Sequence, residues 1–470
     1  MKKTLVALFV TGYVGIAFAD QVVDTDIVVV GAGGAGFSAA VAAAEAGAKN
    51  IVLLEKNPVV GGHTVISGGS VNAVDTKRQK AMGIEDSADK MAAQTLKAGD
   101  YRADPALVKT LADNSEAAIN WMEGLGVQWN PRVFEAWGGL FARSHNSGDK
   151  NAGHDYIRVL NKAAKAHGVQ IKTNTKAVEL LRKDDQSPVT GVVAQAKNGE
   201  KITYNAKAVV LATGGFTANV PMRMRYDRRL DASFKTTANP TGKGFDGSTG
   251  DGINMATKVG ADTDGMNYIQ LIPFVGGRVI DYVGGDIFVD PQGKRFVNEG
   301  GRRDAIADAV LALPGRTMWV ITDDQSLKGA SLETKLKKGI VFKADTVEEM
   351  AKKMNVDPKV LQQTLDRYNE FAAKKEDPDF GKTTFTQLIN KPPYYFGTET
   401  QDVHFSCGGL RITPQAQVVD VNGKVIPGLY AAGETTGGIH GTNRAGGNAL
   451  IDSFVFGRIA GQQAAATAAK

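Results

Sequence analysis

A glycine-rich turn near the start of the chain constrains its fold more than any other feature of the sequence. Residues 26–36 read Asp-Ile-Val-Val-Val-Gly-Ala-Gly-Gly-Ala-Gly, so an apolar strand runs directly into a Gly-x-Gly-x-x-Gly turn. An alanine-rich segment follows, and the next apolar strand ends on Glu55, about 20 residues beyond the turn. This order and spacing predict a dinucleotide-binding β-α-β unit.

The three glycines of the motif have different physical tasks. Gly31 allows the tight turn, Gly33 lets the backbone approach a pyrophosphate, and Gly36 lets the helix pack on the strand. The free N–H groups at the helix start favour phosphate, and Glu55 can accept hydrogen bonds from a ribose hydroxyl. The alternative is an ordinary glycine-rich turn, but it would not require strand, helix and acid in register.

The first 19 residues have the pattern of a secretory signal peptide. Residues 2 and 3 are lysines, an apolar stretch covers residues 5–18, and Ala-Phe-Ala at 17–19 is a small-residue cleavage site. The stretch is shorter than the roughly 20 residues of a membrane span, and no later segment is apolar enough, so no membrane insertion is expected. Removing two lysines lowers the formal net charge from +5 to +3, and no basic run indicates nucleic acid binding.

Cys407 is the single cysteine of the chain. It cannot form a disulfide within the chain, and neither a c-type haem attachment site nor a cysteine-bound iron–sulfur cluster can be built from it. An exported protein with so few cysteines fits a bacterial periplasm, where soluble NADH is not expected. Any electrons would therefore come from another protein, and no metal site is expected.

The 470 residues are too many for one simple core. We expect an α/β chain in which a signal peptide, residues 1–19, precedes a split Rossmann-like domain. Its first part covers residues 20–268 and its second part residues 404–470, because nucleotide-binding signatures return there. An inserted α+β capping domain is expected over residues 269–403.

Periodicity and turn residues predict the main elements within these domains. Helices are expected over 105–125, 155–167, 347–354 and 358–375, strands over 169–174, 189–196, 201–211, 285–290 and 316–322, and an irregular return connection over 376–403.

Three separated blocks of sequence carry a family resemblance. The first joins residues 31–36 to 53–56 and to Gly61-Gly-His-Thr64. The second is Gly293-Lys-Arg-Phe-Val-Asn-Glu299 with Arg303-Asp304, and the third combines residues 404–409, 427–434 and 440–450. Together they resemble the flavoprotein family of soluble fumarate reductases, the flavin part of flavocytochrome c, which also includes urocanate and methacrylate reductases.

The resemblance implies FAD as cofactor, more often non-covalent than covalent in soluble members. It also implies that a capping domain covers the flavin. The residues that it places at the cofactor are Gly31, Gly33, Gly34, Ala35, Gly36, Glu55, Lys56, Gly62, His63, Thr64, Gly68, Gly69, Ala177, Thr213, Gly214, Asp251, Glu434, Arg444, Ala449 and Leu450.

The resemblance also implies how an unsaturated acid would be reduced. Arg303 matches the proton-donating arginine, and His404 and Arg444 match the pair that grips the substrate carboxylate; Gly441 belongs to the same substrate site. Arginine suits a carboxylate because it offers planar, bidentate hydrogen bonds. Flavin N5 would then deliver hydride to the β-carbon, and the resulting carbanion would take a proton.

Each of these three residues has a plainer interpretation. Arg303 could form a structural ion pair with Glu299 or Asp304, His404 could be a satisfied buried histidine, and Arg444 could belong to a helix or loop salt bridge.

The chain departs from the fumarate-reducing members at two places. Val279 and Tyr282 stand at the closest ungapped positions to the glutamate and arginine of the proton relay. Ile272 precedes Pro273, where the family has the histidine for the second carboxylate. These changes favour an α,β-unsaturated monocarboxylate with a different far end over fumarate.

Two kinds of far end remain open. In urocanate-type members acids hold the imidazole, and Asp281 and Glu135 lie in the corresponding regions; Asp281 could instead be an altered relay or a solvated loop acid. An apolar pocket for an aryl or alkyl acrylate is the other hypothesis, with candidate walls at Trp137, Phe141, Ile272 and Phe274.

His63 has a separate interpretation. The Gly-Gly-His-Thr run resembles the covalent flavin site of respiratory succinate dehydrogenases, where soluble relatives usually have asparagine, but its spacing to Gly68-Gly69 is one residue short. Covalent attachment is the less favoured alternative.

The sequence therefore predicts a periplasmic FAD-dependent reductase of a C=C bond, with a separate c-type cytochrome or similar donor. Three rivals remain: a fumarate reductase proper, a desaturating dehydrogenase of the ketosteroid type, and a flavin electron carrier without a substrate.

Overall fold

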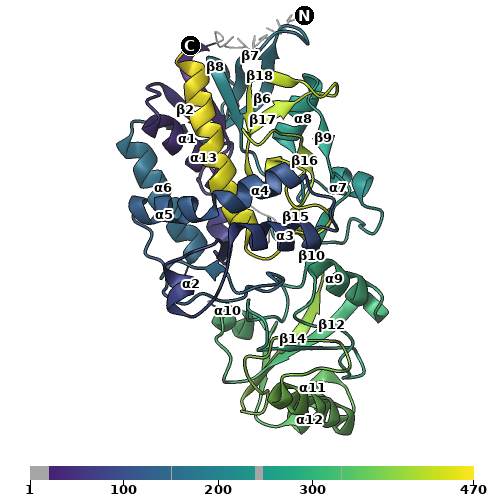
Figure 1. Ribbon diagram of the computed structural model, residues 1–470. Coiled ribbons are helices and arrows are strands. Elements are labelled where there is room, and N and C mark those ends of the chain that lie inside the picture. Colours follow the sequence, from purple (N-terminus) through teal and green to yellow (C-terminus); the bar gives the residue numbers. More distant parts are fainter. Residues whose placement is uncertain (1–20, 150, 239–246, 330) are drawn as a thin grey trace, which may run out of the picture.

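The computed structural model describes residues 21–149, 151–238, 247–329 and 331–470. The signal peptide predicted over residues 1–19 lies outside the described residues. In Figure 1 the chain forms an upper lobe around one large sheet and a lower lobe around a smaller sheet.

The upper lobe is built on an eight-stranded sheet whose order along its main path is β17-β18-β8-β1-β2-β5, with β7 pairing β8 and β6 pairing β7. Parallel pairs join β1 to β2 and β8, β8 to β18, and β2 to β5. The strands are β1 (Gln21–Val30), β2 (Ile51–Leu54), β5 (Gln170–Lys172), β6 (Thr175–Arg182), β7 (Val189–Ala196), β8 (Lys201–Leu211), β17 (Gln417–Val419) and β18 (Val425–Ala431).

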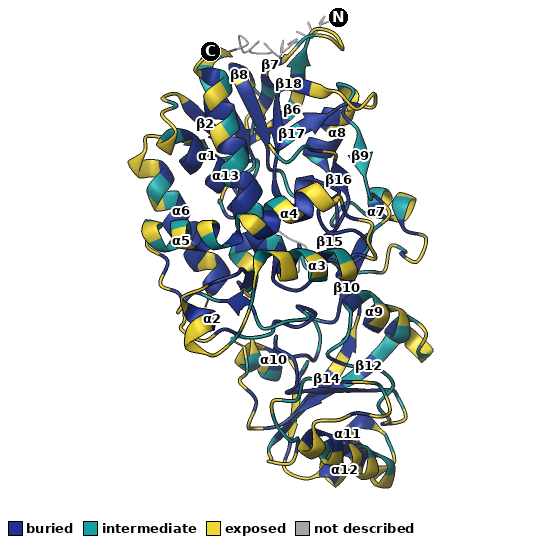
Figure 2. Cartoon of the chain, viewed as in Figure 1, coloured by how far each residue is buried: buried dark blue, intermediate teal, exposed yellow. Residues whose placement is uncertain are grey.

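Helices cover this sheet, and its central strands are therefore buried. Residues 27–30 of β1 and 51–54 of β2 are buried runs of apolar residues, as expected for parallel strands covered on both faces. Figure 2 shows β2 and much of α1 and α13 as buried. The helices of this lobe are α1 (Gly34–Glu45), α2 (Arg78–Ala81), α3 (Ala88–Ala98), α4 (Pro105–Asp113), α5 (Ser115–Leu125), α6 (Ala152–Ala166), α7 (Val220–Tyr226), α8 (Asp251–Lys258) and α13 (Asn448–Ala468), with 3₁₀ turns η1 (Thr64–Ile66) and η3 (Gly433–Thr435).

The lower lobe contains an antiparallel sheet in the order β11-β12-β14-β13. Buried apolar residues of α11 and α12 pack on it, with Phe396 at 0% exposure. Its strands are β11 (Ile287–Val289), β12 (Thr317–Thr322), β13 (Phe342–Ala344) and β14 (Tyr394–Thr400), and its helices are α9 (Arg303–Leu311), α10 (Leu332–Lys337), α11 (Val347–Met354) and α12 (Pro358–Lys374), with η2 (Pro314–Arg316).

A two-stranded ribbon joins the lobes where the chain leaves the large sheet and returns to it. Strand β10 (Ile269–Ile272) pairs antiparallel with β15 (Asp402–Ser406), with Ile272 opposite Asp402. Two further small sheets pair β3 (Val71–Asn72) with β4 (Ser144–His145), and β9 (Thr263–Asp264) with β16 (Gly409–Leu410).

The predicted fold class is confirmed, since the large α/β sheet takes strands from both ends of the chain and the smaller sheet comes from the residues between them. The exact domain boundaries at 268/269 and 403/404 stay predictions. No helix in the described ranges is both long and apolar enough to cross a membrane.

Two of the predicted elements were wrong. The helix expected over residues 105–125 breaks at Asn114, where its side chain bonds the Thr110 carbonyl and α5 begins. The connection expected to be irregular over 376–403 contains β14, because alternate residues such as Tyr394 and Phe396 are buried against the helices of the lower lobe.

Candidate active site

One cavity of about 310 Å³ gathers most of the residues that the sequence singled out. It lies where β1, β8 and β18 end, at the edge of a parallel sheet where ligands of such folds bind. The predicted cofactor residues that line it are Gly31, Gly33, Gly34, Ala35, Glu55, Lys56, Gly62, His63, Thr64, Gly68, Gly69, Ala177, Thr213, Gly214, Asp251, Glu434, Arg444, Ala449 and Leu450.

The glycine turn has the shape that a pyrophosphate needs. Gly31 has φ +103°, and a Cβ there would lie 2.4 Å from the Ala212 carbonyl oxygen. A Cβ on Gly36, which does not line the cavity, would lie 1.8 Å from the Gly31 oxygen, so helix and strand pack too closely for a side chain. Gly33 caps α1 without a side-chain hydrogen bond, and although the Gly34 N–H donates to the Thr64 hydroxyl at 3.1 Å, the next N–H groups of the first turn can bind an anion.

The acid at the end of β2 is held firmly in the cavity wall. Glu55 accepts hydrogen bonds from the backbone N–H groups of Ala32 at 3.0 Å and Asn57 at 2.8 Å. The nearby Lys56 donates to Asp251 at 2.8 Å. The glycine turn, the start of α1 and the fixed carboxylate of Glu55 together fit a dinucleotide such as FAD.

Arg303 enters the same cavity from the first residue of α9. Its Nε and Nη2 donate to the Trp137 carbonyl at 3.2 and 2.6 Å, and its Nη1 donates to the Gln270 amide oxygen at 3.4 Å. Gly138 has φ +69°, and a Cβ there would lie 2.7 Å from Arg303. The Trp137 carbonyl and the close approach of Gly138 thus fix the orientation of the Arg303 guanidinium.

The plainer interpretation of Arg303 as a structural ion pair is not what the geometry shows. Glu299 pairs instead with Arg295 at 2.7 Å and Lys382 at 3.1 Å, and Asp304 pairs with Arg302. Burial, together with the neighbouring Arg444 and Arg278 cations, lowers the pKa of Arg303 well below its ordinary value.

Arg444 and His404 face the cavity with Arg303. The Arg444 guanidinium lies 4.7 Å from the Phe405 ring and donates to the Ala445 carbonyl, and burial lowers its pKa to about 10. Burial, Arg444 and Arg303 lower the pKa of His404 well below its usual range. His404 is therefore neutral and can offer one N–H. The salt-bridge interpretation of Arg444 is not supported, because it pairs with no carboxylate among the described residues.

The opposite part of the wall is apolar apart from one acid. Trp137, Ile272 and Phe274 line it, and so does Asp281. Burial raises the pKa of the Asp281 carboxyl, although Arg278 opposes this shift.

Three other candidates do not line the cavity. Glu135 accepts a hydrogen bond from Thr384 at 3.2 Å, and Phe141 lies under the Lys90 ammonium. Gly441 packs on Gly99, where a Cβ on Gly441 would lie 2.3 Å from the Gly99 oxygen. Their proposed roles in the substrate site stay predictions without support from the geometry.

Sequence reasoning missed two residues beside Arg303. Gln270 bridges Arg303 to the Arg444 carbonyl, to which it donates at 2.9 Å. Arg278 is buried, pairs with Asp286 at 2.8 Å and stacks on Trp137, so the indole has one guanidinium at 4.5 Å and Arg303 at 4.9 Å. Neither residue stands in a recognisable motif, so the sequence did not mark them as site residues. Arg278 could have been noticed because it adjoins Val279, the altered relay position.

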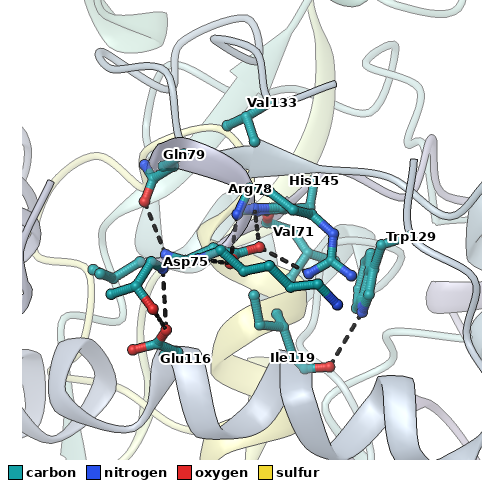
Figure 3. Close-up of polar contacts among 12 residues, drawn as sticks. Val71, Asp75, Arg78, Gln79, Glu116, Ile119, Trp129, Val133 and His145 are labelled. Carbon is teal, nitrogen blue, oxygen red and sulfur yellow. Dashed lines mark hydrogen bonds and ion pairs between the residues drawn. The ribbon is translucent and has the colours of Figure 1, made fainter. Parts of the chain in front are cut away.

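A buried polar network supports one side of the cavity. Figure 3 shows Asp75 between Arg78, at 2.9 Å, and His145, at 3.1 Å. Burial opposes ionisation of Asp75, but these contacts hold the pKa of its carboxyl well below the usual range. The network fixes β3 beside β4, and Asn72 on β3 donates at 2.6 Å to the Gly446 carbonyl next to the cavity wall.

Comparisons with known proteins agree with this geometry. A family model described as FAD binding domain matches residues 26–450. The chain is 38% identical over 448 residues to fumarate reductase (cytochrome) of Shewanella frigidimarina, covering 94% of this chain and 77% of that protein. It is 38% identical over 467 residues to urocanate reductase of Eggerthella lenta, covering 95% and 75%. The open conformation of a flavocytochrome c3 fumarate reductase superposes with a TM-score of 0.75 at 36% identity, covering 95% of this chain and 79% of the other.

Proposed function

The chain belongs to the family of FAD-dependent flavoprotein reductases that includes fumarate and urocanate reductases, and on this premise we propose that it reduces the C=C bond of a small α,β-unsaturated monocarboxylate. FAD is its cofactor, held by the glycine turn and Glu55. The proposal adds to the family assignment a substrate class, a compartment and an electron donor.

A single observation carries the proposal: Arg303, Arg444 and His404 converge on one cavity without a protein carboxylate to pair either arginine among the described residues. Buried cations without a partner are costly, so the site favours an anionic ligand. One planar carboxylate matches the bidentate donors of Arg444 and an N–H of His404.

The residues divide the chemistry between them. When bound, FAD supplies the hydride that reduces the substrate double bond. Arg444 and His404 polarise the carboxylate, which makes the β-carbon electrophilic, and Arg303 places an N–H where the α-carbon needs a proton. An arginine with a lowered pKa is a better acid than a free one, and its contacts with Trp137 and Gln270 keep it aimed.

The far end of the substrate is not expected to be a second carboxylate. Ile272, at 4% exposure, lines the cavity where a second carboxylate would need a donor, and Asp281 adds a buried carboxyl whose charged form is already costly. Two carboxylates in this buried place could not both ionise without a further cost. An apolar aryl or alkyl group would fit Trp137, Ile272 and Phe274, and an imidazole could donate to Asp281.

The compartment and donor follow from the sequence. The pattern of residues 1–19 supports export to the periplasm, and a chain whose one cysteine is buried cannot hold a c-type haem. We therefore propose a separate c-type cytochrome, or a similar periplasmic protein, as electron donor.

Anaerobic oxidation of reduced methyl viologen by the FAD-loaded protein tests the proposal. Acrylate, methacrylate, cinnamate and urocanate would be compared with fumarate at equal concentrations. We expect turnover with at least one monocarboxylate and little with fumarate. Faster turnover of fumarate would refute the monocarboxylate assignment, and no turnover with any acid would refute the reductase proposal.

A further inference from the structure

Four polar side chains, those of Glu434, His63, Thr237 and His404, form a row along the cavity, called the string below. It ends at the carboxylate grip, the pair His404 and Arg444 that is proposed to bind the substrate carboxylate. Glu434 Oε2 lies 3.6 Å from His63 Nδ1. His63 Nε2 lies 3.4 Å from Thr237 Oγ1, and the same hydroxyl lies 2.7 Å from His404 Nδ1. All four residues line the cavity, yet the reaction proposed above uses only His404.

The end of the string determines which nitrogen of His404 carries its proton. To donate to a substrate carboxylate, neutral His404 must have its proton on Nε2, so Nδ1 must accept. The Thr237 hydroxyl then has to donate to Nδ1. A hydroxyl has one proton, so toward His63 the oxygen can only accept.

The other end of the string bears on which nitrogen of His63 carries a proton. Glu434 faces Nδ1 of His63 with a carboxylate, which only accepts, while Thr237 requires a donor at Nε2. His63 meets this requirement when its Nε2 carries a proton. A neutral ring with its proton on Nδ1 would reverse the string: Thr237 would donate to His63, and His404 would present a lone pair to the substrate.

We infer that His63 is a positioning residue that, through Thr237, holds His404 in the tautomer that binds the substrate carboxylate. The Glu434 carboxylate lies 3.6 Å from His63 Nδ1, and it is itself fixed by the backbone N–H of Ser406 at 3.0 Å. The inference rests on the proposed function, because it concerns how a carboxylate is held. It also gives His63 a role that does not need a covalent bond to flavin.

Two sets of substitutions test the string in the FAD-loaded protein. Thr237→Val removes the hydroxyl at constant shape. The matched control is Thr236→Val, whose hydroxyl accepts from the Ala238 N–H and is not among the residues that line the cavity. His63→Gln keeps an amide N–H near the position of Nε2, whereas His63→Leu keeps no donor. Flavin content is measured for each variant, since a loss of flavin would mark a folding defect.

The first readout is the Kd of propanoate, a saturated carboxylate that cannot be reduced, from its perturbation of the oxidised flavin spectrum. We expect Thr237→Val and His63→Leu to raise this Kd about tenfold or more, as the loss of one hydrogen bond to a charged group predicts. Thr236→Val should leave it unchanged, and His63→Gln should recover most of the affinity.

The second readout is turnover of the best acid from the viologen assay and of its methyl ester. The Thr237→Val change should raise KM for the acid more than for the ester, whereas a purely structural defect would affect both alike. An unchanged propanoate Kd in Thr237→Val, equal effects on acid and ester, or flavin that stays with acid-precipitated protein would overturn the inference. Loss of propanoate affinity in a protein that reduces no acid would sustain the carboxylate grip while refuting the proposed reaction.

Discussion

Glu399 offers a quantitative test of how the lower lobe supports the active site. It lies on β14 at 1% exposure, and its carboxyl accepts hydrogen bonds from the backbone N–H groups of Gly276, at 2.9 Å, and Arg278, at 3.1 Å. These residues belong to the loop between Phe274 and Asp281, both of which line the cavity. The perturbation is Glu399→Gln, which removes the titrating group at nearly constant volume.

The magnitude follows from the pKa of the carboxyl. Burial raises the pKa of Glu399 to about 7, against an ordinary value of 4.5. The native state therefore holds this proton to higher pH than the unfolded state does, and stability falls as pH rises through this window. Between pH 5 and pH 8 the group costs the wild type about 2.5 kcal/mol.

The glutamine variant should lack this slope. Its amide nitrogen cannot accept from the Arg278 N–H, so it should be less stable than wild type at pH 5 by about 1–3 kcal/mol. At pH 8 the wild type has lost a similar amount, and the two proteins should have nearly equal stability.

Urea unfolding of the FAD-saturated proteins at several pH values, followed by tryptophan fluorescence, measures this difference. Constant excess FAD keeps the linkage to cofactor binding fixed. Glu370→Gln, at an exposed acid on α12 paired with Lys374, is the matched control and should show no such convergence. A stability difference between wild type and Glu399→Gln that changes by less than about 1 kcal/mol from pH 5 to pH 8 would refute the reasoning.

Three further predictions concern the site. Arg303→Lys should lower kcat about 10²–10⁴-fold in the viologen assay, because one ammonium cannot both hold the Trp137 carbonyl and reach the substrate; loss of less than tenfold would argue against Arg303 as the acid. Asp281→Asn should raise the melting temperature more at pH 8 than at pH 4, because burial raises the pKa of Asp281 and the charged form is costly; the same variant should lower kcat/KM for urocanate more than for cinnamate, and equal losses would show that Asp281 does not contact the far end. Asp75→Asn should destabilise the protein by about 1.5–3 kcal/mol in urea unfolding, because Arg78 keeps Glu123, at 2.8 Å, but loses the buried carboxylate that it shares with His145; a loss under 1 kcal/mol would contradict a structural role for the network.

The parts of the molecule set by local sequence could be predicted. The strand, glycine turn and acid at residues 26–55 form a β-α-β unit because each step depends on near neighbours. The strand over 189–196 and the helix over 347–354 have the predicted bounds for the same reason. Helix 105–125 could not be predicted as two helices, because helix periodicity continues past Asn114 and only its hydrogen bond to Thr110 marks the break.

The carboxylate grip could be anticipated only through motifs, and its supports could not. Arg303, His404 and Arg444 stand in recognisable runs, so their meeting in one cavity was expected. Gln270 and Thr237 have no motif around them, and they matter only because folding places them beside Arg303 and His404. Tertiary contacts of this kind leave no periodic signal in a single sequence.

The ribbon of β10 and β15 has a consequence for the range of substrates. Ile272 at the far wall and His404, which binds the substrate carboxylate, stand on its two strands; Ile272 lies opposite Asp402, and His404 lies at the bulge between Val403 and Phe405. Slipping either strand by one residue would turn its own side chain out of the cavity, so the backbone pairing sets the distance between the two ends of the substrate. Exchanging the side chain at position 272 would therefore change which far end of the substrate fits, while the distance from that wall to His404 stays the same.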